Sequence, residues 1–303
     1  MKRREFLRLT TLSVAGGLIP SSNWLARRFH VAPFDVYLTF DDGPFPDKDF
    51  KSGPTDNALQ ILKDHGVVAT FFLHGRHILN WHGPVMVRYI TDGHAIGNHL
   101  WSQGGNLVEL KPGYVRLAYQ FLLTEARIRE VLQAADADAY QRYLQQSRLF
   151  RRPGGKNSLN DFLDPTNEHN ILYAPVIRPI RDDVDWLKGV YDYSGWHING
   201  GESIPLSVRP TTPEGRLKFI LNGANGFYGI MNYLQAGTPP HYSVEATQGL
   251  IVLMHDFDAD TRAILPQLIT QLQSLGAQFH HLPRPIDKPN STTVGIDHAP
   301  TVS

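Results

Sequence analysis

Residues 35–44 read Asp-Val-Tyr-Leu-Thr-Phe-Asp-Asp-Gly-Pro, an apolar run that ends in two acidic residues and a turn. The Val, Tyr, Thr and Phe side chains favour an extended strand, and Gly-Pro ends it. A helical pattern follows over residues 56–65, and a second apolar run follows over residues 67–73. The stretch therefore opens a series of strand–helix units, with Asp41 and Asp42 at the carboxyl end of the first strand.

The same alternation of strand and helix continues along the chain. Further strands are predicted over residues 94–98, 149–150, 173–177, 250–254 and 277–282, and further helices over residues 84–92, 114–132 and 260–275. The Gly- and Pro-rich residues 191–247 give no clear pattern. This order predicts an α/β fold, a distorted (β/α) barrel, although periodicity alone does not separate a barrel from an open sheet.

The composition of the 303-residue chain is that of a globular protein, with 42% hydrophobic and 19% charged residues. There is no cysteine, which excludes disulfides, thiolate metal ligands and a cysteine nucleophile. Basic and acidic residues both number 29, but beyond residue 30 there are 23 basic and 28 acidic residues, a net charge of −5. This balance argues against nucleic acid as a partner.

Residues 1–30 are predicted to be a signal peptide and linker. A basic region precedes an uncharged stretch over residues 9–19, which is too polar for a stable transmembrane span. Residues 3–8, Arg-Arg-Glu-Phe-Leu-Arg, resemble a twin-arginine signal, although Lys2 stands where Ser or Thr is usual. This resemblance implies the twin-arginine export machinery as a partner and a periplasmic or exported location in a bacterium.

Charged and polar residues gather directly after the predicted strands. They are Asp41 and Asp42, His99, Arg151 and Arg152, Asp182, Asp183 and Asp185, and His255 and Asp256. The carboxyl ends of parallel strands lie at one rim of a barrel, which is where barrel enzymes place their active sites. Each cluster alone has an ordinary structural explanation, as a turn or a helix cap. Their joint occurrence in this order predicts one shared site.

The motifs around these residues resemble those of the polysaccharide deacetylases of carbohydrate esterase family 4, also called the NodB-homology domain. Residues 39–44, Thr-Phe-Asp-Asp-Gly-Pro, match the first motif of the family without a change. Four further motifs follow in the family order, at residues 93–99, 150–153, 182–186 and 253–256. The resemblance implies a catalytic domain of the deacetylase type over residues 31–283, followed by a polar tail over residues 284–303.

The resemblance implies hydrolysis of N-acetyl groups and a role for each motif residue. Asp41 would be the general base and His255 the general acid. Arg151 would orient Asp41, and Asp185 would pair with His255 and favour its protonated form. The residues that line the substrate would be Trp186, Pro153 and Gly154. For Trp186, packing in the core is an equally open explanation.

A divalent metal, usually zinc, is also implied by the resemblance, with Asp42 and His99 as ligands. The family's second motif carries two histidines four residues apart, but here Gln103 stands at the second position and an extra glycine follows it. An amide oxygen is a weaker zinc ligand than an imidazole nitrogen. The metal could bind weakly through Asp42, His99 and Gln103, another histidine could replace the lost one, or the site could be metal-free.

His74 is the substitute ligand to test first, because it follows the second predicted strand at the same rim. A lone histidine at such a place is more often a hydrogen-bonded structural residue, so both explanations stay open.

The sequence thus supports one main function and two alternatives. The main one is a metal-dependent hydrolase that removes N-acetyl groups from an acetylated polysaccharide of the cell envelope, either peptidoglycan or a chitin-like polymer. The first alternative, prompted by Gln103, is a metal-independent amide or cyclic-ureide hydrolase on the same fold. The second is an inactive carbohydrate-binding relative. Retention of the base, the acid and the residues that position them weighs against it, because a binding groove needs neither.

Overall fold

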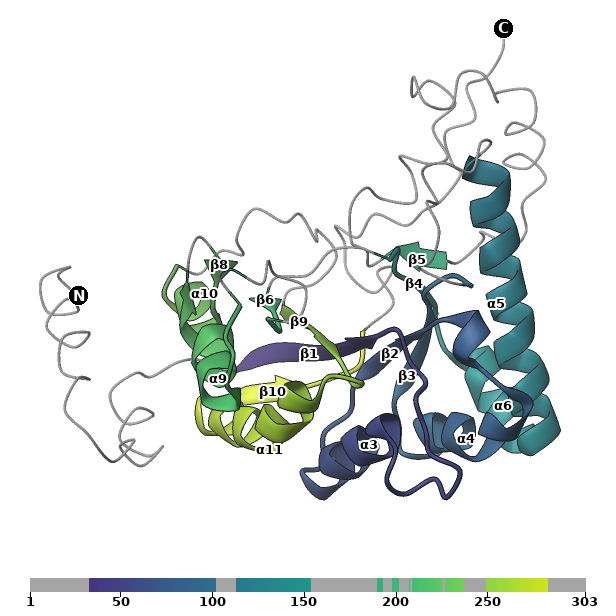
Figure 1. Cartoon of the computed structure of the whole chain (residues 1–303), viewed down its shortest axis with the longest axis horizontal. Coiled ribbons are helices and arrows are strands. Elements are labelled where there is room, and N and C mark those ends of the chain that lie inside the picture. The colour runs from purple at the N-terminus through teal and green to yellow at the C-terminus, as the bar shows by residue number, and fades with distance from the viewer. Residues whose placement is uncertain are drawn as a thin grey trace, which may run out of the picture.

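The computed structural model describes residues 33–101, 113–153, 190–192, 198–201, 207, 209–224, 227–236 and 249–282. Its centre is a sheet in which the described strands pair in parallel (Figure 1). The strand order is β5-β4-β3-β2-β1-β9-β6, with β10 also paired to β1. The strands are β1 (Phe34–Asp41), β2 (Thr70–Leu73), β3 (Ala95–Asn98), β4 (Arg148–Phe150), β5 (Val190–Asp192), β6 (Ile198–Asn199), β9 (Leu250–His255) and β10 (Ala277–Phe279).

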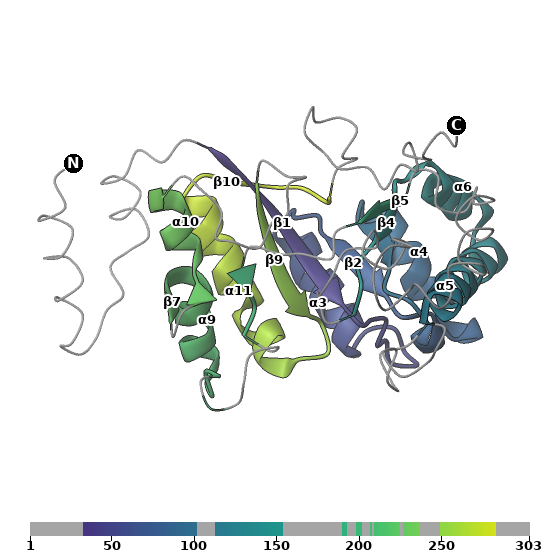
Figure 2. The ribbon, with the colours of Figure 1, turned by 90° about the horizontal axis from the view of Figure 1, so that it is seen from above.

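Helices connect these strands and cover the sheet. Figure 2 shows α9, α10 and α11 to one side of β9 and β1, and α5 and α6 to the other side. The helices are α3 (Pro54–Asp64), α4 (Gly83–Thr91), α5 (Gly113–Ala135), α6 (Ala137–Gln145), α9 (Pro213–Asn222), α10 (Ile230–Ala236) and α11 (Ala259–Ser274). Two short 3-10 turns, η1 (Gly75–His77) and η2 (Asn80–His82), and a small hairpin of β7 (Gly223–Ala224) and β8 (Phe227–Tyr228) complete the described elements.

Local sequence explains where the first helix starts and stops. α3 begins at Pro54, a residue suited to the first turn of a helix because that turn leaves its N–H groups unpaired. The chain leaves the helix through Gly66 at φ 64°, a left-handed conformation that glycine adopts without a steric cost. α3 thereby returns the chain to the amino end of β2, as a strand–helix–strand unit requires.

The central strand β1 sets the position of the polar strand ends. Asp41, its last residue, pairs in register with Phe72 of β2 and with His255 of β9. Asn98, the last residue of β3, pairs with Leu73, the last of β2. The carboxyl ends of these neighbouring strands therefore lie side by side at one edge of the sheet, as the sequence predicted.

The two faces of β1 differ in what they contact. Val36, Leu38 and Phe40 pack into the main apolar core with the helices. Tyr37 belongs to a second cluster that lines the other face of the sheet. Since side chains alternate along a strand, Thr39 and Asp41 continue the face of Tyr37. On this face the apolar cluster of Tyr37 gives way to Thr39 and Asp41 toward the carboxyl end of β1.

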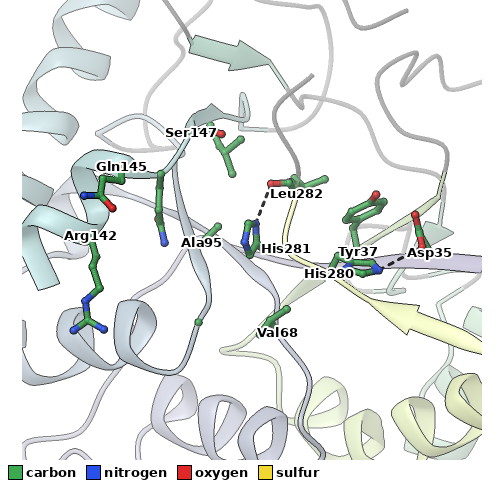
Figure 3. A pocket seen from close by; sticks show the side chains of 13 residues that line it. Asp35, Tyr37, Val68, Ala95, Arg142, Gln145, Ser147, His280, His281 and Leu282 are labelled. Carbon is green, nitrogen blue, oxygen red and sulfur yellow. Dashed lines mark hydrogen bonds and ion pairs between the residues drawn. The ribbon is translucent and has the colours of Figure 1, made fainter. Parts of the chain in front are cut away.

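A cavity of about 850 Å³ opens at the amino ends of the strands (Figure 3). Asp35 and Tyr37 of β1 and Ala95 of β3 line it, together with His280 and Leu282, which follow β10. It lies at the opposite edge of the sheet from the acidic strand ends, so it is separate from the predicted site.

The α/β fold predicted from the sequence is confirmed, with the expected strands at the start, middle and end of the chain. Among the described strands no pairing joins β5 to β6, so closure of the barrel stays a prediction. The helices α6, α9 and α10 were not predicted. The predicted strand over residues 173–177, the signal peptide and the polar tail lie outside the described residues. None of the described helices is both long and apolar enough to cross a bilayer.

Candidate active site

Asp41 and Arg151 form a buried ion pair at the carboxyl end of β1. Nη1 of Arg151 lies 2.9 Å from Oδ1 of Asp41 and also donates to Oγ1 of Thr39 at 2.6 Å. The Thr39 hydroxyl in turn donates to the carbonyl of Val252 in β9. Arg151 is fully buried and Asp41 nearly so. These contacts fix one carboxylate oxygen of Asp41, while its Oδ2 faces the imidazole of His99 at 3.7 Å.

Asp42 turns out of the strand and into the same site. In a continuing strand it would point to the opposite face from Asp41. Instead it adopts φ 76°, which is uncommon for a residue other than glycine. Nδ1 of His77 contacts the carbonyl oxygen of Asp42 at 2.7 Å and holds this turn. The left-handed turn is what allows adjacent aspartates to share one site.

Three imidazoles surround the carboxylate of Asp42. Oδ1 lies 3.0 Å from Nε2 of His74 and 3.4 Å from Nε2 of His99, and Oδ2 lies 3.8 Å from Nε2 of His255. Burial acts to raise the pKa of Asp42, but the imidazoles of His74, His99 and His255 beside its carboxylate outweigh burial and hold the pKa well below its usual value. Asp42 is therefore an anion at neutral pH.

Backbone carbonyls orient two of these histidines. Nδ1 of His99 lies 2.7 Å from the carbonyl oxygen of Arg151, and Nδ1 of His74 lies 3.3 Å from that of Leu100. Leu100 adopts φ 64°, and its carbonyl also accepts from the N–H of Gly75. A carbonyl oxygen can only accept, so each Nδ1 carries the proton and each Nε2 presents a lone pair.

The arrangement of these lone pairs fits a cation. Burial lowers the pKa of His74, which favours its neutral form. Its Nε2 lies 3.0 Å from the Asp42 carboxylate, yet the pair lacks hydrogen-bond geometry. Two imidazole lone pairs and a carboxylate that converge in this way repel one another unless a cation lies between them. Asp42, His74 and His99 each offer a ligand atom, and these atoms lie within 4.8 Å of one another.

His255 ends β9 on the far side of Asp42. Its side chain is mostly buried. The next residue, Asp256, is fully buried and accepts a hydrogen bond from the hydroxyl of Thr55 at 2.6 Å. Burial raises the pKa of Asp256 to about 6. The end of β9 thus holds His255 beside the cluster of Asp42, His74 and His99, and the carboxyl group of the next residue is buried.

The predicted residues that the structure describes gather at one edge of the sheet. They are Asp41, Asp42, His74, His99, Arg151 and His255. Pro153 is half-buried two residues beyond Arg151. The predicted residues Gln103, Gly154, Asp185 and Trp186 lie outside the described residues.

Three further residues that support the site were not predicted as functional. Thr39 holds the guanidinium, Leu100 orients His74, and His77 holds the turn at Asp42. Thr39 lies within the matched first motif, so its role had a sequence signal. The role of Leu100 depends on a backbone conformation that its residue type does not favour, so no sequence pattern indicates it.

Several known proteins that resemble this chain are named as deacetylases. The sequence model of the polysaccharide deacetylase family matches residues 31–173. The peptidoglycan-N-acetylglucosamine deacetylase of Bacillus cereus is 33% identical over 186 residues, which are 61% of this chain and 58% of that protein. The enzyme PgdA of Listeria monocytogenes, also a peptidoglycan-N-acetylglucosamine deacetylase, is 41% identical over 247 residues, 80% of this chain and 37% of that protein. The chain thus spans less than two thirds of these relatives.

Solved structures share the fold. A family 4 carbohydrate esterase of Streptococcus mutans superposes with a TM-score of 0.55 at 24% identity, covering 86% of this chain and 91% of that one. The catalytic domain of a peptidoglycan N-acetylglucosamine deacetylase of Eubacterium rectale gives a TM-score of 0.53 at 18% identity, covering 92% and 96%. The family match over residues 31–173 and these shared folds support a polysaccharide deacetylase domain of the carbohydrate esterase family 4, NodB type.

Proposed function

We propose that this protein is a metal-dependent hydrolase that removes N-acetyl groups from an amino-sugar polymer of the bacterial cell envelope, either peptidoglycan or a chitin-like chain. One observation carries the proposal: the Asp41–Arg151 pair, the cluster of Asp42 with two histidines, and His255 meet at one strand edge. The names of the relatives from Bacillus cereus and Listeria monocytogenes support the substrate class. The basic and uncharged blocks of residues 1–30 support export by the twin-arginine route to the periplasm.

The metal ligands in this proposal are Asp42, His74 and His99. Two imidazole nitrogens and one carboxylate oxygen are a donor set that zinc accepts in catalytic sites. The carbonyl contacts at each Nδ1 are the outer contacts typical of histidine ligands. His74 thereby supplies the second histidine that the usual motif position, Gln103, lacks. When bound, the metal would polarise the acetyl carbonyl and lower the pKa of a bound water.

The residues around the metal cluster account for both proton transfers. The Arg151 guanidinium occupies Oδ1 of Asp41, so Oδ2 is the oxygen placed to accept the proton of the attacking water. His255, on the opposite side of Asp42, would donate a proton to the amine nitrogen as the C–N bond breaks. Asp185 would pair with His255. The products are acetate and a free amino group on the sugar.

The position of His74 supports a metal-dependent enzyme over the metal-independent alternative. That alternative was prompted by the loss of a histidine ligand at Gln103, and a histidine now lies 3.0 Å from the carboxylate of Asp42. The buried Asp41–Arg151 pair beside His255 favours a catalytic function over simple binding. Burying an ion pair costs desolvation energy, and a binding groove does not need such a pair.

Acetate release from two substrates tests the proposal. Purified peptidoglycan and N-acetylglucosamine oligomers are incubated with the protein as purified, after chelation, and after zinc is added back. We expect release that chelation abolishes and zinc restores, and no release by an Asp41→Asn variant. Release that survives chelation would move the protein to the metal-independent class. No release from any acetylated glycan would leave only a binding function.

A further inference from the structure

Three aromatic side chains form a continuous row along the edge of the sheet that carries the candidate active site. Phe257 follows β9, Phe45 follows β1, and His77 follows β2. The rings of Phe257 and Phe45 make an edge-to-face contact with centroids 5.4 Å apart, and the rings of Phe45 and His77 lie 5.0 Å apart. Because β9, β1 and β2 are neighbours in the sheet, this aromatic row runs across three consecutive strand ends.

The aromatic row is joined to the catalytic groups at both ends. The ring of Phe257 lies 5.3 Å from the ring of His255, the candidate general acid. At the other end, His77 contacts the carbonyl oxygen of Asp42, a candidate metal ligand. The aromatic row therefore starts beside His255, which would protonate the leaving amine, and ends in contact with the backbone of Asp42, which would hold the metal.

Hydrogen bonds beneath the row fix its middle member. The N–H of Phe45 donates to the hydroxyl oxygen of Thr55 at 2.7 Å, and that hydroxyl donates to the buried carboxyl group of Asp256. Asp256 immediately precedes Phe257 in the sequence. The loop after β1 and the loop after β9 are thus tied together, so Phe45 and Phe257 are presented as one preorganised surface.

Phe257 remains 45% exposed although burial of such a side chain would be favourable. Phe45 and His77 are each half-buried. Two other large exposed apolar side chains, Leu144 on α6 and Tyr228 on β8, are single residues on other elements, and these need no explanation. Phe257 differs from them because it continues into two further rings and into the active site. An exposed aromatic surface at such a place is typical of a ligand-binding groove.

We propose that the aromatic row is a subsite that stacks against a sugar ring adjacent to the one being deacetylated. This inference rests on the proposed function. The acetylated nitrogen must lie within reach of His255, so its sugar occupies the position next to the ring of Phe257. A pyranose has an apolar face of C–H groups and a polar edge of hydroxyl groups, which matches the flat apolar face and open surroundings of an exposed phenyl ring. The next sugar along the chain then lies over Phe257 and Phe45.

The subsite gives the enzyme a preference for polymers. The monosaccharide N-acetylglucosamine can occupy the reaction site without filling the row, whereas a pentasaccharide fills both. Filling the aromatic row is expected to raise the affinity for the oligosaccharide about three- to tenfold, which is the range that one aromatic contact contributes.

Titration calorimetry on full-length protein tests this subsite. N-acetylglucosamine and the β-1,4-linked pentasaccharide of N-acetylglucosamine are titrated into an Asp41→Asn variant, with and without Phe257→Ala. We expect Phe257→Ala to weaken pentasaccharide binding about three- to tenfold and to leave monosaccharide binding unchanged, and we expect Phe257→Tyr to restore the pentasaccharide affinity. Tyr228→Ala is the matched control, because Tyr228 is also 45% exposed but lies on the β7–β8 hairpin. It should change neither affinity.

Steady-state kinetics of the Phe257→Ala variant, with Asp41 retained, provide a second readout. Phe257→Ala should raise KM for the pentasaccharide with kcat within about twofold, since the variant leaves the reacting groups in place. If the wild-type protein deacetylates oligomers and Phe257→Ala keeps full pentasaccharide affinity, the subsite is refuted while the proposed function stands. An equal loss for monosaccharide and pentasaccharide would make Phe257 a structural residue and would also refute the subsite. If no oligomer is bound or deacetylated by the parent protein, the proposed function fails first.

Discussion

The guanidinium carbon of Arg151 lies 4.3 Å from the centre of the Phe72 ring. Arg151 is thus held from two sides, by the aromatic ring on one face and by Asp41 and Thr39 at one nitrogen. A guanidinium stacks on an aromatic ring and donates hydrogen bonds in its own plane at the same time. The cation that positions the candidate general base is therefore fixed by packing as well as by charge.

Arg151→Lys should lower kcat for acetate release by about 10- to 100-fold, because an ammonium group cannot stack on Phe72 while donating to both Asp41 and Thr39. Metal affinity should stay within about threefold, since Arg151 holds His99 only through its backbone carbonyl. Steady-state kinetics and calorimetry measure the two quantities. Arg142→Lys is the control, because Arg142 is exposed on α6 and lines the cavity at the opposite edge of the sheet. Wild-type kcat in the Arg151 variant would contradict a positioning role.

His74→Ala should lower zinc affinity by more than about 100-fold, because even loss of an outer contact to a metal ligand costs 10- to 100-fold. Calorimetry with zinc measures this directly and does not depend on activity. His280→Gln is the matched control, since His280 is half exposed at the opposite edge of the sheet. Unchanged zinc affinity in His74→Ala would remove His74 from the ligand set.

A second substitution asks what Gln103 does. Gln103→His should tighten zinc binding and raise turnover if this residue occupies the second ligand position of the family motif. In the His74→Ala background it should restore much of the lost affinity. If Gln103→His changes neither protein, Gln103 does not occupy that position.

Asp256→Asn should stabilise the protein at neutral pH. The carboxyl group has a folded-state pKa of about 6, raised by burial above its unfolded value of 3.8, so the folded state favours the protonated form. Its contribution to stability is therefore complete below about pH 4 and is lost as the pH rises through 6. Asparagine still accepts the hydrogen bond from Thr55 without ionising. The free energy of unfolding should rise by up to about 3 kcal/mol at pH 8 and by little at pH 4.

Urea denaturation of both proteins at pH 4, 6 and 8 checks this effect. The difference between variant and parent should grow with pH across the lower part of that range and then level off. A constant difference at all three values would mean that Asp256 ionises in the folded state as easily as in the unfolded chain.

The sequence allowed most of the sheet and much of the site to be predicted. The strand at residues 35–40 and the acidic pair after it were recognisable because an apolar run and a Gly-Pro stop are local signals. α6 was missed although Asp136 caps it, because its alternating Ala and Asp residues give no strong apolar stripe at its start. α9 was missed because its buried Arg216 pairs with Asp258 and Asp260, residues distant in the sequence.

The sequence by itself determined which chemical groups stand at the strand ends, because strand, turn and motif are encoded by neighbouring residues. Only the tertiary structure decided that His74 and His99 reach the same carboxylate oxygen. That convergence depends on the register between β1, β2 and β3 and on left-handed turns at Asp42 and Leu100. These conformations are imposed by contacts between distant segments and not by local preference. His94, by contrast, is a buried structural residue whose Nδ1 accepts a hydrogen bond from the N–H of Ala69.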